Sequence, residues 1–365
     1  MKKVLFVVPD LRGGGAERVL VNLVNHLDKS RFSVTLLSIF DCGENKKRLS
    51  PDIAYRFIFK KQFRGNSHLF KALSPAQLYR QWIPETYDIV VSFLEGTAAR
   101  LVSGCGDEHI RKLCWIHTSL RDSSVLAQGF RSAEEAKRCY AAFDQIVCVS
   151  EGVRQDFAQA TGLDDMAVCY NPIDSESIRA LAKQTPPVEV DANMLNLCAV
   201  GRLVPVKGFA RLIPILRRLL DEGLPVHLYL CGEGAQRQKL EQTAQDAGVT
   251  PNVTLTGFLD NPYALMARCD LFVCSSFREG FSSAAAEALL CHLPVVTVDV
   301  PGMAELLNGS GVICENDDEA LYLALRDVLL DENKRHLLRQ SAAKRSKFFD
   351  IHSSVRAIEA LLEAR

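Results

Sequence analysis

The strongest constraint on the fold is a regular alternation of short apolar runs with amphipathic segments along most of the chain. In the first half the apolar runs cover residues 4–8, 34–39, 88–93, 112–117, 146–150 and 167–170. Between the first two runs, apolar residues recur at helical spacing from Ala16 to Leu27. This order is typical of parallel βαβ units, so the sequence predicts an α/β fold.

A second series of apolar runs follows a polar, proline-bearing break. The runs cover residues 196–201, 226–231, 253–256, 270–274, 294–298 and 311–314. A chain of 365 residues is too long for a single core and suits two domains. We therefore predict two Rossmann-like, doubly wound sheets facing a central cleft, with ligands beyond the carboxyl ends of the strands. The predicted boundaries are a first domain at 1–175, a linker at 176–195, a second domain at 196–345 and a C-terminal helix at 346–365 that packs back on the first domain.

Composition and charge exclude several classes of function. The net charge is −1, so attraction to nucleic acid does not organise this chain. The twelve cysteines include no Cys-x-x-Cys pair, and Cys148, Cys198, Cys231, Cys274 and Cys314 lie in apolar runs. This usage favours reduced core thiols over disulfides or a zinc site. The first apolar run is too short for a signal peptide and ends in Pro-Asp, so we expect a cytoplasmic protein.

The most specific motif is Glu279-Gly280-Phe281-Ser282-Ser283-Ala284-Ala285-Ala286-Glu287. It follows an apolar run, and a serine is suited to cap a helix that the alanines continue. Free N–H groups at such a helix start bind anions, while carboxylates accept hydrogen bonds from paired sugar hydroxyls. The motif predicts a diphosphate site with one glutamate on each side, unless both glutamates are only solvated charges.

Three further loops follow predicted strands. Gly201-Arg202 and Lys207-Gly208 place two cations beyond a strand end, where they could neutralise a diphosphate without a metal. Arg12-Gly13-Gly14-Gly15 lets the backbone approach a ligand closely, although it would serve equally well as a tight turn. His117 ends another strand and points toward the same predicted cleft; such a histidine is more often structural.

Together these motifs resemble glycosyltransferase family 4, retaining enzymes of the GT-B fold that use nucleotide-activated sugars. The resemblance runs almost the whole length of the chain. It implies that Arg202 and Lys207 clamp the diphosphate, and that Glu279 holds the donor sugar and Glu287 the ribose. It places His117 near the transferred sugar and the acceptor. It further implies donor contacts from a set of loop and helix-start residues: Gly14, Gly15, Gly201, Gly232, Phe258, Phe281, Ser282, Ser283 and Ala284. Ser282-Ser283 departs from the glycine and apolar residue common in relatives, which leaves the donor's identity open.

The resemblance also implies a reaction. We expect a retaining hexose or N-acetylhexosamine transferase with a UDP-sugar as co-substrate and no cofactor or metal, since the chain has no Asp-x-Asp. The alternatives are an epimerase or phosphorylase on the same fold, or a silent nucleotide-sugar-binding protein.

The acceptor side is suggested by a basic, aromatic-rich segment at 46–80. Nine cations, among them Lys60, Lys61 and Arg64, stand there against the single acid Asp52. Such a segment suits an anionic membrane surface and would imply a lipid-linked saccharide acceptor in polysaccharide or lipopolysaccharide synthesis. It would equally suit a solvated face with core aromatics beneath. No RNA-binding motif accompanies it.

Overall fold

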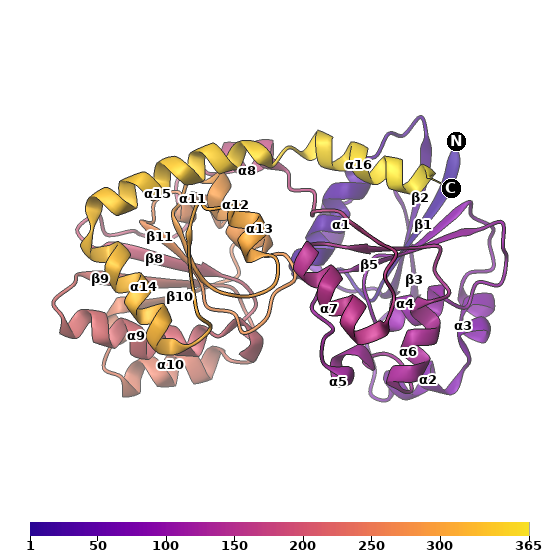
Figure 1. Cartoon of the computed structure of the whole chain (residues 1–365), viewed down its shortest axis with the longest axis horizontal. Helices are drawn as coiled ribbons and strands as arrows, with labels where there is room; N and C mark the ends of the chain where they lie inside the picture. The colour runs from indigo at the N-terminus through magenta and orange to yellow at the C-terminus, as the bar shows by residue number, and fades with distance from the viewer. Residues whose placement is uncertain (365) are drawn as a thin grey trace. The chain divides into compact units, whose positions relative to one another are not determined.

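A computed structural model describes residues 1–364 and contains two compact units. The first comprises Met1–Pro172 together with His352–Arg365, and the second comprises Ile173–Ile351. Both units are built on wholly parallel sheets with helices on the two faces (Figure 1). The prediction of two Rossmann-like domains is therefore confirmed.

The first unit contains a seven-stranded sheet in the order β3-β2-β1-β4-β5-β6-β7. Its strands are β1 Lys2–Val8, β2 Phe32–Phe40, β3 Ala54–Phe59, β4 Ile89–Ser92, β5 Arg111–Ile116, β6 Gln145–Cys148 and β7 Met166–Val168. Its helical elements are α1 Gly15–His26, η1 Glu44–Arg48, α2 Asn66–Ala72, α3 Pro75–Trp82, α4 Thr97–Val102, α5 Ser123–Leu126, α6 Ala133–Tyr140, α7 Glu151–Thr161 and α16 Ile351–Glu363.

The second unit contains a six-stranded sheet in the order β10-β9-β8-β11-β12-β13. Its strands are β8 Leu195–Val200, β9 Val226–Cys231, β10 Val253–Gly257, β11 Leu271–Cys274, β12 Val295–Val298 and β13 Val312–Cys314. Its helical elements are α8 Ser175–Leu181, η2 Pro205–Lys207, α9 Phe209–Asp221, α10 Arg237–Asp246, η3 Thr250–Asn252, α11 Tyr263–Met266, α12 Ser283–Leu290, α13 Met303–Leu307, α14 Asp318–Leu330, α15 Glu332–Arg345 and η4 Ser346–Phe348.

The central strands are apolar on both sides because helices cover both faces of each sheet. The side chains of Val4–Val8 on β1 are buried, as are those of Leu271–Cys274 on β11. The core thiols follow the same rule, since Cys148, Cys198, Cys231 and Cys274 are buried, while Cys314 on an outer strand is partly exposed.

The strand order reverses at one point in each sheet. β1 pairs with both β2 and β4, and β8 pairs with both β9 and β11. Ligands of doubly wound sheets bind at such switch points, beyond the carboxyl ends of the two strands. The loops that follow β8 and β11 are therefore expected to carry a ligand site in the second unit, and those after β1 and β4 in the first unit.

Helix α16 returns to the first unit after the chain has completed the second (Figure 1). Arg31 donates to Glu359 at 2.8 Å and to Glu363 at 2.5 Å, and Arg111 donates to the Leu361 carbonyl at 2.6 Å. The predicted linker, residues 176–195, contains most of helix α8 and belongs to the second unit.

Within residues 1–364, we find no helix with the length and apolar character required to span a bilayer.

The sequence patterns did not predict β3 or the two short helices after it. β3 is the edge strand of its sheet and pairs only with β2. All six of its residues are exposed or partly exposed, so it lacks the continuous buried apolar run that marks the inner strands.

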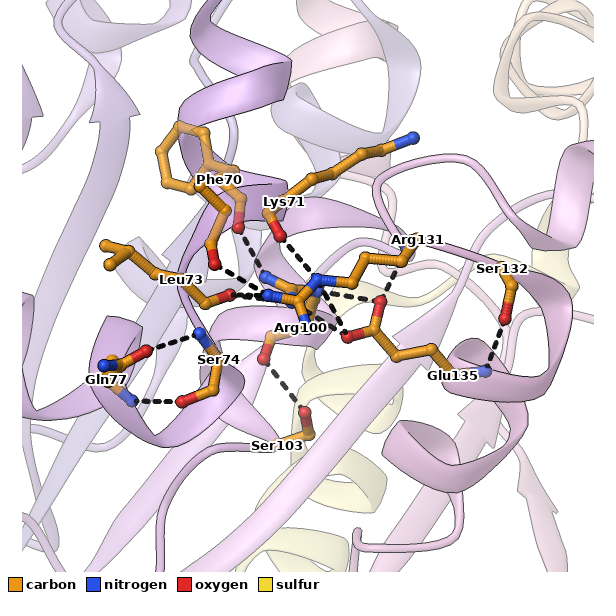
Figure 2. A network of polar contacts seen from close by, with 11 residues as sticks. Phe70, Lys71, Leu73, Ser74, Gln77, Arg100, Ser103, Arg131, Ser132 and Glu135 are labelled. Carbon is orange, nitrogen blue, oxygen red and sulfur yellow. Dashed lines mark hydrogen bonds and ion pairs between the residues drawn. The ribbon is translucent and has the colours of Figure 1, made fainter.

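Two arginines fasten the segment after β3 to the rest of the first unit (Figure 2). The guanidinium of Arg100 is fully buried and donates to Glu135, to the Phe70 carbonyl at 2.6 Å and to the Leu73 carbonyl at 2.9 Å. Arg131 donates to the carbonyls of Lys71 and Ala72 at 2.5 and 2.7 Å. These cations satisfy carbonyls that the end of helix α2 leaves without intrahelical partners.

Candidate functional site

The loops after β8 and β11 meet at the switch point of the second sheet. The Ser275 hydroxyl donates to the Lys207 carbonyl at 3.0 Å, and the Phe277 N–H donates to the Val206 carbonyl at 2.8 Å. These bonds hold the two predicted motifs against each other. Two sequences more than sixty residues apart thus form one surface.

The centre of this surface is an ion pair between Lys207 and Glu279. The Lys207 ammonium lies 2.6 Å from Oε1 of Glu279, and the Ser276 hydroxyl donates to the same oxygen at 2.6 Å. The Glu279 side chain is 10% exposed and that of Lys207 is 25% exposed. The pair is thus partly accessible and is held in place by Ser276, as a binding group for an incoming ligand should be.

Arg202 lies on the same loop as Lys207 and is exposed. Its guanidinium makes no hydrogen bond or ion pair with any other part of the described chain, residues 1–364. A guanidinium presents several donors in a planar fork that matches phosphate oxygens. Arg202 is therefore available to an anionic ligand.

Close backbone packing explains two of the glycines in these loops. Gly208 has a φ of +66°, and a Cβ there would lie 2.1 Å from the Ser275 carbonyl oxygen. A Cβ on Gly232 would lie 1.9 Å from the carbonyl oxygen of Gly201. The loops after β8, β9 and β11 can therefore approach this closely only because both residues are glycine.

Helix α12 begins beside this ion pair. Ser282 is its N-cap and accepts from the Ala285 N–H at 3.4 Å. Phe281 and Ser282 are buried, whereas Ser283 and Ala284 in the first turn are partly exposed. The exposed part of this helix start is the part that could meet an anion.

Glu287 lies one turn into α12 and is 8% exposed. The hydroxyl of Tyr263 donates to its Oε1 at 3.1 Å. Tyr263 is itself fully buried, so this bond orients the carboxylate from the core side. A second glutamate is thereby held on the same helix as the predicted anion site.

Phe258 follows β10 and is 52% exposed. The N–H of Gly232 donates to the Gly257 carbonyl at 2.9 Å, which joins the loop after β9 to the loop after β10. Gly232 and Phe258 therefore lie on neighbouring loops at the same edge of the sheet as Gly201.

Arg211 is a residue of this region that the motif analysis missed. Its side chain is 4% exposed and donates to Asp318 at 2.6 Å, to Asn316 at 2.7 Å and to the Ser275 carbonyl at 3.4 Å. It thus ties α9 to the loops after β11 and β13. A charged residue inside the apolar stripe of the α9 sequence, between Phe209 and Leu212, is the signal that could have revealed it.

In the first unit, His117 stands at the carboxyl end of β5. Its ring packs on Phe93 at a centroid distance of 4.8 Å, and its backbone N–H donates to Glu95 at 3.0 Å. Its Nε2 is buried and has no partner among residues 1–364. Burial lowers the pKa of His117 to about 3, against a smaller opposing effect of a hydrogen bond with the Phe93 backbone. The imidazole is therefore neutral near pH 7, with one ring nitrogen that can donate a hydrogen bond and one that can accept one.

Gly14 and Gly15 lie at the start of α1, where Gly14 is the N-cap. The loop before them is fixed by Arg12, whose guanidinium pairs with the buried Asp10 at 2.7 Å. A Cβ on Gly14 would meet the Glu17 carboxylate at 1.9 Å. These glycines lie at the switch point of the first sheet, since β1 pairs with β4.

The basic, aromatic-rich segment at 46–80, predicted to meet a membrane, contains both exposed and buried residues. Lys60, Lys61 and Arg64 are exposed after β3, with Phe63 40% exposed beside them. Phe70, by contrast, is buried and packs on Trp82 at 5.1 Å. The basic residues and some aromatics are available to a partner, while other aromatics of the segment serve the core.

The structure thus brings Lys207 and Glu279 into contact and groups Gly201, Arg202, Gly232, Phe258 and the start of α12 at one edge of the second sheet. His117, Gly14, Gly15 and the basic segment belong to the first unit. Across residues 1–364, no three His, Cys, Asp or Glu side chains gather in a way that could hold a metal ion.

The second unit also contains a cavity of about 970 Å³ lined by residues of the segment 185–196, by Pro225, Arg268 and Asp270. These residues lie before or at the start of β8 and before β9 and β11. The cavity therefore opens at the amino edge of the sheet, opposite the edge that carries the predicted donor residues, and we do not assign the donor to it.

Two known family models match the chain. Residues 13–177 match the model described as Glycosyltransferase Family 4, and residues 185–345 match that described as Glycosyl transferases group 1. The chain belongs to glycosyltransferase family 4. The two matches together account for nearly all of both units, so the family that the motifs resembled is confirmed.

Two curated relatives illustrate the family. An N-acetylgalactosamine-N,N'-diacetylbacillosaminyl-diphospho-undecaprenol 4-alpha-N-acetylgalactosaminyltransferase from Campylobacter jejuni is 31% identical over 217 residues, 58% of each chain. The lipopolysaccharide core biosynthesis glycosyltransferase LpsE from Rhizobium meliloti is 25% identical over 327 residues, 89% of this chain and 88% of its own length. The first alignment thus spans little more than half of that relative.

Among solved structures, HepE from Anabaena in complex with UDP and glucose matches over 99% of both chains with a TM-score of 0.79 and 21% identity. WaaG, a glycosyltransferase involved in lipopolysaccharide biosynthesis, matches with a TM-score of 0.74 and 19% identity, over 99% of this chain and 100% of its own. At these identities the matches establish the shared GT-B fold.

Proposed function

We propose that this protein transfers a hexose or N-acetylhexosamine from a nucleotide diphosphate sugar to a saccharide acceptor, with retention of anomeric configuration. The observation that carries the proposal is the Lys207–Glu279 pair at the switch point of the second sheet, beside the exposed Arg202 and the start of α12. A cationic group next to a helix start suits a diphosphate, and a fixed carboxylate suits sugar hydroxyls.

The proposed roles follow from these positions. Arg202 and Lys207 neutralise the diphosphate as it leaves, and the N–H groups at the start of α12 add their dipole. Glu279 accepts hydrogen bonds from the donor sugar, and Glu287 accepts them from the ribose. Phe258, Gly201 and Gly232 border the nucleotide. For the first unit, the family resemblance assigns a phosphate contact to Gly14 and Gly15, and a place near the transferred sugar and the acceptor to His117.

In the proposed step the bond between the anomeric carbon and the diphosphate oxygen breaks. An acceptor hydroxyl forms the new bond on the same face, and its proton passes to the departing diphosphate. Two protein cations already supply the charge that a metal would otherwise supply, so we propose that the reaction needs no metal. UDP is the favoured nucleotide, and UDP is bound in the HepE complex.

The proposed acceptor is lipid-linked. Support comes from the relatives, one of which is named for a diphospho-undecaprenol substrate and another for lipopolysaccharide core biosynthesis. The exposed cations Lys60, Lys61 and Arg64 would let the first unit rest on the anionic inner face of the cytoplasmic membrane.

The test is a thermal-shift screen of the purified protein against UDP, GDP and ADP, followed by their sugar conjugates. We expect one diphosphate to raise the melting temperature and the matching sugar conjugate to be hydrolysed slowly without acceptor. Binding without hydrolysis or transfer would indicate a silent nucleotide-sugar-binding protein, and an epimerised sugar would indicate an epimerase. Either result would contradict the proposal.

A further inference from the structure

The loop after β4 holds a glutamate that the motif analysis passed over. Glu95 follows the apolar strand by three residues and is succeeded by Gly96, whose φ is +80°. Because β4 pairs with β1, Glu95 lies at the switch point of the first sheet. This is the edge at which doubly wound sheets bind their ligands.

The two units repeat the same arrangement. In each sheet the fourth strand in chain order is the one beyond the switch point, β4 in the first and β11 in the second. A Glu-Gly pair follows each of them: Glu95-Gly96 after β4 and Glu279-Gly280 after β11. The glutamate that we assign to the donor sugar thus has a topological counterpart in the first unit.

Contacts fix the position of Glu95 next to His117. Its Oε2 accepts the backbone N–H of His117 at 3.0 Å, while the buried Nε2 of His117 has no partner among residues 1–364. The Glu95 carboxylate therefore lies against the backbone of His117, a residue whose imidazole carries the unsatisfied nitrogen, at the ends of two paired strands. Buried polar atoms are nearly always hydrogen-bonded, so this nitrogen points to a ligand group that can bond with it.

Hydrogen bonds to the core hold the loop that carries Glu95 in place. The Gly96 N–H donates to the hydroxyl of the buried Tyr140 at 3.3 Å. Helix α4 starts at the next residue, and its Arg100 is fastened to Glu135 in the network of Figure 2. A side chain on so well-supported a loop can orient a substrate without first being ordered.

We propose that Glu95 is an acceptor-binding residue whose carboxylate, with Nε2 of His117, holds hydroxyl groups of the terminal sugar of the acceptor. The inference rests on the proposed transferase function and adds the residue that selects its second substrate. Glu95 would act on the acceptor as Glu279 acts on the donor, by accepting hydrogen bonds from neighbouring hydroxyls.

The test compares E95Q with wild type and with E108Q, which alters an exposed glutamate of the same unit. Glutamine keeps an oxygen that can accept the His117 N–H but lacks the charge and one acceptor. The assays are donor hydrolysis without acceptor, and transfer to octyl glycosides of glucose, galactose, N-acetylglucosamine and N-acetylgalactosamine. Melting temperatures with and without UDP report on the fold and the donor site.

We expect E95Q to hydrolyse the donor and respond to UDP within twofold of wild type. Its kcat/KM for the octyl glycoside should fall about 10- to 100-fold, mainly through KM, because a hydrogen bond to a charged group is lost. E108Q should match wild type. Transfer by E95Q at the wild-type rate would overturn the inference, as would a wild-type protein that hydrolyses donor but uses none of the glycosides. Absence of both donor hydrolysis and transfer in wild type would instead refute the proposed function.

Discussion

Lys207 and Glu279, 72 positions apart in the sequence, lie 2.6 Å from each other where the second sheet reverses its strand order. The contact joins the two motifs that the sequence marks as most specific. It also makes each residue's contribution measurable, since one can be removed while the other remains.

We expect Glu279→Ala and Lys207→Ala each to lower turnover by about 100-fold or more, the usual effect of removing one group that stabilises a transition state. Neither change should unfold the protein, because the partner left behind can be solvated from the open side of the pair. The measurement is kcat with the melting temperature of each variant.

The matched control is Glu241→Ala, which breaks an exposed pair with Arg237 in the same unit. It should leave kcat unchanged. Wild-type turnover in either site variant would refute our assignment of the donor residues.

Chelation tests whether the cations replace a metal. We expect turnover in EDTA to equal turnover without it, because Arg202 and Lys207 supply positive charge at the diphosphate. Loss of activity that manganese restores would show that these residues do not suffice.

Vesicle binding tests the basic segment after β3. We expect K60Q/K61Q to bind vesicles of phosphatidylglycerol and phosphatidylcholine about tenfold or more weakly than wild type, since each basic residue near an anionic surface contributes about 1 kcal/mol. The control K137Q/R138Q removes two exposed cations from α6. Co-sedimentation that does not depend on the anionic lipid content would contradict membrane contact by this segment.

The buried pair of Arg100 and Glu135 predicts an effect on stability. Burial acts to raise the pKa of Glu135, but hydrogen bonds from Arg100 and the Arg131 backbone lower it below its usual value. Glu135→Ala leaves the fully buried Arg100 guanidinium without its counter-ion, which should reduce the free energy of unfolding by about 3–5 kcal/mol.

Urea unfolding followed by tryptophan fluorescence can measure this loss, because both tryptophans, Trp82 and Trp115, lie in the first unit. Glu85→Ala, which breaks the exposed pair with Arg56, should cost less than about 1 kcal/mol. Equal losses in the two variants would show that the network of Figure 2 contributes no more than a surface pair.

The low pKa of His117 predicts that acid destabilises the first unit. Between an unfolded pKa of about 6.5 and the folded value of about 3, the unfolded chain binds a proton that the folded chain does not, so the free energy of unfolding falls as the pH falls. This histidine alone should remove about 1.5 kcal/mol between pH 6.5 and pH 5. His117→Gln should lose correspondingly less than wild type over that range. The exposed His109→Gln serves as the control, and a pH dependence in His117→Gln equal to that of wild type would refute the burial effect.

The sequence predicts most of both sheets because inner parallel strands are buried on both faces and leave continuous apolar runs. β3 was not predicted because an edge strand pairs with one neighbour only and is less buried than an inner strand. Its sequence, which includes Phe57 and Phe59, therefore resembles that of an amphipathic surface segment. Phe70, from the same segment, belongs to the core, as its burial and its packing against Phe40 and Trp82 show.

The site was predicted only where several chemically suited residues stand together. Glu279 and Lys207 belong to dense motifs, whereas Glu95 is a single acid after a strand and Arg211 a single cation within an apolar helix face. The significance of the last two lies in contacts, Glu95 with His117 and Arg211 with Ser275, that involve residues far away in the chain.

The return of helix α16 to the first unit has a consequence for biosynthesis. Arg31 can form its ion pairs with Glu359 and Glu363 only after the ribosome has translated every strand of the second unit. The first unit to emerge is therefore the one that cannot be completed early, and its surface around Arg31 stays uncovered while more than three hundred further residues are made. A chaperone that binds nascent chains could bind this surface throughout that time.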